Sequence, residues 1–266
     1  MLKPMLDAHS IESITLTCEY DGDVSSVGLS VIKEEASRLK LKYQNRRIAR
    51  RPVNQGDSFS SEAADILGYS FLSKDSERDI SKFDIINENA LVTSFAYTSF
   101  KAFLADVSFS LSVAHRAFLL SERKLDKIVL SYRNSFIADS ADEIHKAIRS
   151  SSPYIANVCL SKVNFWHSRI GFFSNEPLQY PLFLHNVEAT HKLLKVEEGS
   201  FEEDAKNIHQ LQIDTHHVMN INIPVGVEEF GHLIEARSTD LRDKHLQILR
   251  GIITDEVAGL INLSME

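Results

Sequence analysis

Cysteine and glycine are both scarce in this chain, which has two cysteines and ten glycines among 266 residues. Cys18 and Cys159 lie far apart and form no CxxC pair. The sequence therefore predicts neither a structural zinc site nor a thioredoxin-like motif. Two isolated cysteines in a mid-sized chain are typical of reduced, packed thiols in a reducing cytosol. We expect no bound metal and no other cofactor.

Glycine-dependent motifs are missing as well, because the chain contains no GxGxxG, no GxxxxGK[S/T] and no GxSxG. The first two build the phosphate-binding loops of nucleotide-binding folds. The third forms the nucleophile elbow of many hydrolases. No catalytic residue can be assigned from such motifs, and their absence favours a non-enzymatic protein.

Long apolar runs are absent too. The most apolar region, residues 95–120, is interrupted by Lys101, Asp106, His115 and Arg116, so we expect no membrane-spanning helix there. The N-terminus lacks the apolar core of a signal peptide. These features predict a cytoplasmic protein without a membrane partner.

Periodicity in the first half predicts alternating strands and helices. Apolar and polar residues alternate over 11–20, which indicates a strand, and helical spacing follows over about 25–40. Residues 41–53 are predicted to be extended, and residues 54–63 to form a loop. Later segments are predicted as three short strands at 69–72, 80–86 and 90–97, a long helix at 99–120, a strand at 125–137 and a short helix at 139–149.

The second half begins after the helix breaker Ser150-Ser151-Ser152-Pro153. Strand character returns at 158–173 and 182–196, with an acidic turn at 197–204. Strict alternation over 211–223 is typical of a half-buried antiparallel strand. A helix is predicted from residue 227, with a new start capped by Thr254.

Short links between strands predict an α+β fold with antiparallel sheets. Each sheet is expected to be backed by a long helix, which gives two similar lobes in one body. The break at 150–153 places the lobes at residues 1–149 and 150–266. The length is compatible with this division, since it corresponds to one large domain or two small ones.

Charge is distributed unevenly along the chain, whose formal net charge is −8. Seven cations fall within residues 38–51, with no acid between Glu35 and Asp57; removing them from the 29 cations leaves 22 against 37 acids, a net charge of −15. The candidate binding residues of this basic arm are Arg38, Lys40, Lys42, Arg46, Arg47, Arg50 and Arg51. Such an arm is typical of a surface for phosphates or for an acidic partner. It is equally explained by neutralisation of the chain's own acids, or by protection of an edge strand from pairing.

Eleven histidines and scattered carboxylates suggest no metal centre by their spacing. His216 and His217 are adjacent on a strand and point to opposite faces, so His217 is predicted to be a core histidine. Asp106 with Glu122-Arg123-Lys124 imitates the acid spacing of a metal nuclease, and Asp214 and His216 share a polar strand face. We weigh these only as a third hypothesis, because strings of this kind arise by chance.

Several segments together carry a family resemblance. They are Tyr69 to Asp75, Asn89 to Thr93 with Tyr97, Lys127 to Asn134, Leu211 to Asp214 and the closing helix from His245 to Ile261. Over residues 11–263 the chain resembles a sporadically distributed family of uncharacterised bacterial proteins of about 250 residues. The family's signature of a basic residue, Ile-Gly-Leu-Arg-Tyr, a variable residue and Asn departs here at Val129 and Ser131. The segment 178–210 is longer than in that family.

The resemblance implies an α+β fold and a bacterial setting near mobile or defence-type genes, but no activity. The first hypothesis is a non-enzymatic binding or regulatory protein that holds a protein partner, such as a toxin or another defence effector, or a second copy of itself. A nucleic-acid-binding protein that uses the basic arm is the alternative. A metal-dependent nuclease or hydrolase is the third.

Overall fold

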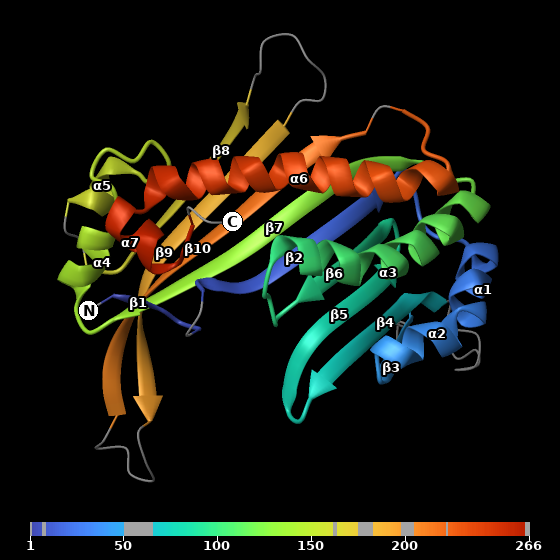
Figure 1. The fold of residues 1–266 in the computed structure, drawn as a ribbon, viewed down its shortest axis with the longest axis horizontal. Helices are drawn as coiled ribbons and strands as arrows, with labels where there is room; N and C mark the ends of the chain where they lie inside the picture. The colour runs from blue at the N-terminus through green and yellow to red at the C-terminus, as the bar shows by residue number, and fades with distance from the viewer. Residues whose placement is uncertain are drawn as a thin grey trace, which may run out of the picture. The chain divides into compact units, whose positions relative to one another are not determined.

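The computed structural model of the protein describes residues 2–6, 9–50, 66–161, 164–174, 183–197, 205–221 and 223–263. The fold is mixed α and β with a large antiparallel sheet (Figure 1). The strands are β1 (Lys3–Pro4), β2 (Ile11–Tyr20), β3 (Asn45–Arg50), β4 (Ile66–Asp75), β5 (Arg78–Ile86), β6 (Asn89–Ser94), β7 (Leu125–Ala138), β8 (Trp166–Ser174), β9 (Phe183–Glu197) and β10 (Ala205–Asn220). The helices are α1 (Ser26–Glu34), α2 (Ala36–Lys42), α3 (Phe100–Leu120), α4 (Ala141–Ala147), α5 (Asn157–Leu160), α6 (Val227–Ile252) and α7 (Asp255–Leu260).

Contacts between residues divide the chain into two compact units. Unit 1 comprises Met1–Ile14, Leu130–Val218 and Thr239–Glu266, and unit 2 comprises Thr15–Val129 and Met219–Ser238. Four elements, β2, β7, β10 and α6, contain residues of both units. Residues on both sides of the expected boundary at 149/150 belong to unit 1.

Unit 2 is built around the strand order β3-β4-β5-β6-β2. The β3·β4, β4·β5 and β5·β6 pairs are antiparallel and form the meander that the short links predict. Ser76 and Asn87 take positive φ angles of 54° and 53° in the turns between strands. The core side of the meander is aromatic, with Phe71 and Phe83 stacked at 5.6 Å between ring centroids. Helix α3 packs against α1 and β6.

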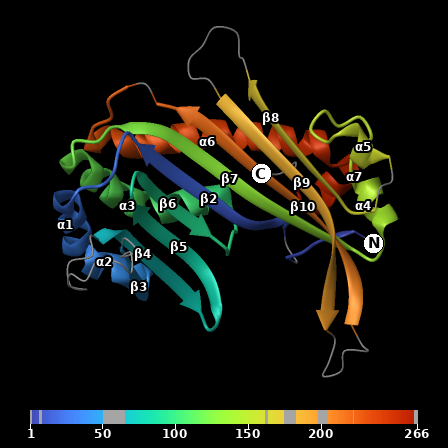
Figure 2. The ribbon, with the colours of Figure 1, turned by 180° about the vertical axis from the view of Figure 1, so that it is seen from behind.

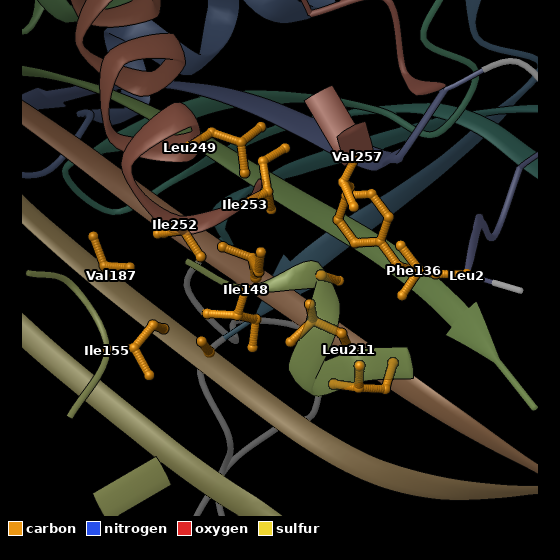
Figure 3. Close-up of a cluster of buried hydrophobic side chains, with 14 of the residues drawn as sticks. Leu2, Phe136, Ile148, Ile155, Val187, Leu211, Leu249, Ile252, Ile253 and Val257 are labelled. Carbon is orange, nitrogen blue, oxygen red and sulfur yellow. The ribbon is translucent and has the colours of Figure 1, made fainter. Parts of the chain in front are cut away.

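Unit 1 has the strand order β7-β10-β9-β8, with β1 paired to β7. Its core joins side chains of the strands to the C-terminal half of α6 and to α7 (Figure 3). Phe136 of β7, Val187 of β9 and Leu211 of β10 meet Ile252 and Ile253 in this cluster, and all five are fully buried or nearly so. Burying such side chains stabilises the fold by about 1.5–3 kcal/mol each.

Most of the elements expected from periodicity are present. The strand predicted at 11–20 is β2 with the same bounds, and the helix predicted at 99–120 is α3. The helix predicted at 25–40 is interrupted at Glu35, whose ψ of 0° ends α1 before α2 begins. The strand predicted at 158–173 is wrong at its start, because residues 157–160 form the short helix α5 and β8 begins at Trp166. The loop predicted at 54–63 lies outside the described residues, and so does the acidic turn predicted at 197–204, except for Glu197, which is the last residue of β9.

Helix α3 is long and apolar enough to cross a membrane, on length and composition alone. The expectation that its charged residues exclude this was therefore too strong. Half of its most apolar window is buried inside the protein, which is also what the core helix of a soluble domain shows. Its buried side chains include Phe103, Val107, Leu111 and Phe118.

Candidate functional site: the basic edge strand β3

The basic arm of the sequence is distributed over two elements of unit 2. Helix α2 carries Arg38, Lys40 and Lys42, and β3 carries Arg46, Arg47 and Arg50. Arg51, the seventh candidate, lies outside the described residues. The two sets of cations have different surroundings. Neutralisation of the chain's own acids explains Arg38 and Lys42, whereas a binding surface and protection of an edge strand are the explanations that apply to β3.

Two cations of α2 are neutralised within the chain. Arg38 bonds Glu35 at 3.0 Å and lies over the ring of Phe109, 4.5 Å from its centroid. Lys42 pairs with Asp106 of α3 at 2.8 Å and also donates to its backbone carbonyl. Partial burial lowers the pKa of Lys42, and its hydrogen bond to Asp106 opposes that shift. Arg38 and Lys42 therefore serve the fold, as the neutralisation hypothesis predicts.

In the part of the chain that the structure describes, the arginines of β3 have no such partners. Arg46, Arg47 and Arg50 are all exposed, and within the described ranges none of them forms an ion pair with a carboxylate. In the antiparallel register Arg46 is opposite Phe71 and Arg47 is opposite Ser70. Directly opposed residues share a sheet face, so Arg46 extends over the aromatic face and Arg47 over the other. The guanidinium of Arg46 lies 5.6 Å from the ring centroid of Tyr69.

Strand β3 is the last strand in the order of its sheet (Figure 1). It pairs with β4 along one side, and no other described strand pairs with its opposite side. An edge strand of this kind presents unpaired backbone N–H and C=O groups in a row. Two exposed apolar side chains lie near the arginines in the sequence, Ile48 at 42% and Leu41 at 88% exposed.

Buried aromatic residues hold this edge in place. Tyr43, which joins α2 to β3, is fully buried, and its hydroxyl lies 3.1 Å from Ser110 Oγ of α3. Burial raises the pKa of the Tyr43 phenol, so the group stays neutral. The ring of Tyr43 also contacts Phe71 and Phe83, at 6.3 and 6.1 Å between centroids. The strand that carries the exposed arginines is thus anchored by buried contacts, which lowers the conformational entropy that binding would cost.

The histidines of unit 1 form contacts that their spacing did not predict. His185 of β9 and His217 of β10 lie 2.9 Å apart through their Nδ1 atoms, and His191 and His209 lie 3.0 Å apart. His245 of α6 bonds Thr215 at 2.9 Å. As predicted, His216 is exposed, with its Nδ1 2.8 Å from Ser131 Oγ, whereas His217 is buried. Each pair joins two neighbouring strands. The signal in the sequence was that His185 and His191 stand on one face of β9 by alternation, and His209 and His217 on one face of β10.

These rings are held neutral in the core. Burial lowers the pKa of His185 and His191 to about 4 and of His245 to about 3, and Lys244, His209 and Arg242 add smaller effects on the same three rings. Burial also lowers the pKa of His217. Among the residues that the structure describes, no three His, Cys, Asp or Glu side chains are arranged to hold a metal ion.

The carboxylates of the nuclease hypothesis have separate partners. Asp106 pairs with Lys42, and Asp214 of β10 pairs with Arg133 of β7 at 3.0 Å. Glu122 follows the end of α3 with a φ angle of 59°. The described residues therefore offer no cluster of acids to that chemistry.

Comparisons with protein-family models, curated proteins and solved structures find no match to this chain. The resemblance to the sporadically distributed bacterial family stays a prediction.

Proposed function

We propose that this protein is a non-enzymatic binding protein that holds an extended, acidic segment of a protein partner against the edge of β3. The observation that supports the proposal is the exposure of Arg46, Arg47 and Arg50 on an edge strand, without a carboxylate partner among the described residues. The family resemblance extends the proposal to partners such as toxins or other defence effectors in a bacterial cytoplasm.

Both faces of the strand contribute arginines, and this favours an added strand as the partner. A peptide that pairs with β3 places its alternate side chains beside Arg46 on one face and beside Arg47 on the other. A rigid nucleic-acid backbone lying along one face would leave the arginines of the other face unused. Arginine also suits the carboxylates of such a peptide, because its guanidinium binds them in a bidentate manner.

The charges of the strand also exclude one simple partner. Pairing of β3 with the β3 strand of another copy would bring like charges side by side, which destabilises a strand pair. In addition, among the described residues acids pair with Arg38 and Lys42, and none of them pairs with a β3 arginine. An acidic segment of a partner is complementary in charge to this surface.

A binding experiment with defined probes tests the proposal. A synthetic peptide of alternating Glu and Val is expected to bind, and its Lys and Val counterpart is not. In the variant Arg46→Glu/Arg47→Glu/Arg50→Glu we expect the dissociation constant to rise by about tenfold or more, because charged contacts are replaced by repulsion. Fluorescence anisotropy measures this directly.

A matched control separates the strand from the overall charge. The variant Lys33→Glu/Lys101→Glu/Lys146→Glu changes three exposed lysines elsewhere and alters the net charge by the same amount. It is expected to bind the acidic peptide almost as the unmodified protein does. Equal loss in both variants, or no binding by the unmodified protein, contradicts the proposal. Binding of single-stranded RNA or DNA that weakens steeply with salt, in place of the peptide, would establish the nucleic-acid alternative.

A further inference from the structure

We propose that two copies of this chain associate through strand β8, edge to edge and antiparallel, about a two-fold axis at Gly171. The contact lies in unit 1 alone and is independent of the binding proposed for β3. It uses the same surface of both molecules, so it closes into a dimer and joins the unit 1 sheets of the two copies.

Strand β8 is the outermost described strand of unit 1 (Figures 1 and 2). It pairs with β9 on one side, and no described strand pairs with its other side. The segment that contains α5 contacts the start of β8, where Ala156 N donates to Ser168 Oγ at 3.0 Å. In the same place Cys159 Sγ lies 3.9 Å from the carbonyl oxygen of His167. Beyond these contacts, residues 169–173 form an open edge that can pair with another strand.

The devices that protect an edge strand from pairing are few on β8. Its nine residues pair with β9 without a register shift, it contains no proline, and Arg169 is its one residue with a permanent charge. Strand β3 differs, because it carries three arginines and a register shift between Ala49 and Arg50. Bulges and charges on an edge oppose pairing, so β8 is suited to pairing where β3 is guarded against it.

Apolar side chains on both faces of the open edge gain contacts when a second strand is added. Phe173 is 58% exposed on one face. On the other face, Ile170 lies opposite the buried Val187 of β9, and Phe172 packs against the same core. Ile170 and Phe172 are only half-buried, so a neighbouring strand would remove further apolar surface from water.

The side chains of the open edge fit one another when Gly171 lies opposite its own copy. Antiparallel pairing then places Arg169 opposite Phe173, and a guanidinium is attracted to an aromatic ring. It also places Ile170 opposite Phe172, so apolar residues meet and no like charges are opposed. A strand glycine is typical of a position where another backbone approaches closely, and Gly171 is at the centre of the open edge.

Sedimentation velocity on the full chain and on variants of Phe173 tests this register. The unmodified protein is expected to dimerise with increasing concentration. Phe173→Lys places a cation opposite Arg169 of the other copy, and the symmetry repeats this contact, so the dissociation constant of the dimer should rise by about tenfold. Phe173→Glu removes the same ring but opposes unlike charges, and it should retain the dimer. Arg169→Glu/Phe173→Lys also opposes unlike charges and should restore it.

A control elsewhere in unit 1 separates the strand from a general effect of added charge. Leu260 of α7 is 48% exposed, and Leu260→Lys should leave the dimer unchanged. Circular dichroism of each variant verifies that it is folded. A monomeric unmodified protein overturns the inference, and so do equal effects of Phe173→Lys and Phe173→Glu. Neither outcome changes the expected binding of an acidic peptide to β3.

Disulfide formation locates the axis independently. In the variant Gly171→Cys the two new thiols belong to directly opposed residues, whose Cα atoms in antiparallel strands are about 4.5–5.5 Å apart, within the range of a disulfide. The new Cβ meets Oδ1 of Asn186 at 2.8 Å, the end of a side chain that can turn aside. Cys18 and Cys159 are buried.

A covalent dimer is therefore expected when Gly171→Cys is oxidised, and non-reducing electrophoresis detects it. The control Gly259→Cys places a thiol on α7, where the glycine is exposed and a Cβ meets no atom within 4 Å. It should stay monomeric on the gel. Equal crosslinking of the two variants, or none in either, overturns the inference.

Discussion

Buried histidines are the residues whose roles sequence spacing described least well. Periodicity correctly placed His217 on a buried face, but it gave no reason to connect His217 with His185, 32 residues earlier. Contacts across strands depend on register, and a shift of one residue turns every side chain to the opposite face. The same limit applies to the basic arm. Composition identified its seven cations, but only the structure shows that Arg38 is neutralised by Glu35, three residues earlier, and Lys42 by Asp106 of α3.

The buried histidines predict a protein that loses stability in mild acid. The pKa of His245 is about 3 in the fold, below its ordinary value of 6.5, because the ring is buried. The unfolded chain therefore binds a proton as the pH falls below about 6.5, whereas the folded chain does not. From pH 7.5 to pH 5, this residue alone should remove about 2 kcal/mol from the free energy of unfolding. Urea denaturation at both pH values measures the loss.

The variant His245→Phe tests whether His245 causes the predicted loss of stability between pH 7.5 and pH 5. Phenylalanine can retain the stacking on Tyr132, 3.7 Å between ring centroids, while it removes the titrating group. We expect the difference in stability between the two pH values to shrink by about 2 kcal/mol. The control His232→Phe changes an exposed histidine of the same helix and should leave the difference unaltered. An unchanged pH dependence in His245→Phe would contradict the assignment.

A glycine in α1 provides a second test at the residue scale. A Cβ at Gly28 would lie 2.3 Å from the backbone oxygen of Ala117 in α3, so the two helices approach too closely there for any side chain. Gly28→Ala is expected to lower the free energy of unfolding by roughly 1–3 kcal/mol through overpacking. Gly231 of α6 is the matched control, because a Cβ there meets no atom within 4 Å. Gly231→Ala should stabilise the protein by about 1 kcal/mol through helix propensity. Similar effects of the two changes in thermal denaturation would contradict this account.

Elements with one strong periodicity were predicted well, and elements set by their neighbours were not. Strand β2 buries one face, which the alternation of its apolar residues predicts. Helix α3 also buries apolar side chains, and their helical spacing predicts them. Helix α5 has only four residues, too few to show a period, and its VCL sequence suits a strand as well. The position of β3 at an edge has one local signature, the charged residues that protect an edge strand from pairing, but strand order itself is decided by pairing.

Helix termini give a test at the scale of the element. Ser99 Oγ accepts a hydrogen bond from the backbone N–H of Ala102, 3.2 Å away, and so caps α3. Ser99→Ala should cost about 1 kcal/mol of stability. Thr254 holds the equivalent position before α7, but its side chain makes no capping bond. Thr254→Ala should cost less than about 0.5 kcal/mol. Equal losses in chemical denaturation would show that the Ser99 bond is not what stabilises α3.

At the scale of the whole molecule, the two units share four continuous elements. Strands β2, β7 and β10 and helix α6 each contain residues of both units. Melting of such an element removes backbone hydrogen bonds from both units, so we expect them to unfold together. The prediction of two lobes that are successive along the chain, at 1–149 and 150–266, stays a prediction, because apolar patterns mark elements and not the way in which contacts group them.

The buried cysteines make the shared unfolding measurable. Cys18 belongs to unit 2 and Cys159 to unit 1, and neither forms a disulfide. Burial raises the pKa of both thiols, most strongly that of Cys18, which keeps them unreactive in the fold. Single-cysteine variants should show the same urea dependence of thiol labelling, coincident with the loss of circular dichroism. Labelling of one site at clearly lower urea than the other would show that the units unfold separately.

The route of the chain also has a consequence for biosynthesis. Unit 1 needs residues from Thr239 onward, and unit 2 needs residues 219–238, so each depends on a segment far along the chain from its first residues. Neither unit can complete its core until these segments have left the ribosome. The nascent protein therefore exposes apolar strands until then, and its yield in the cell should depend on chaperones that hold such chains.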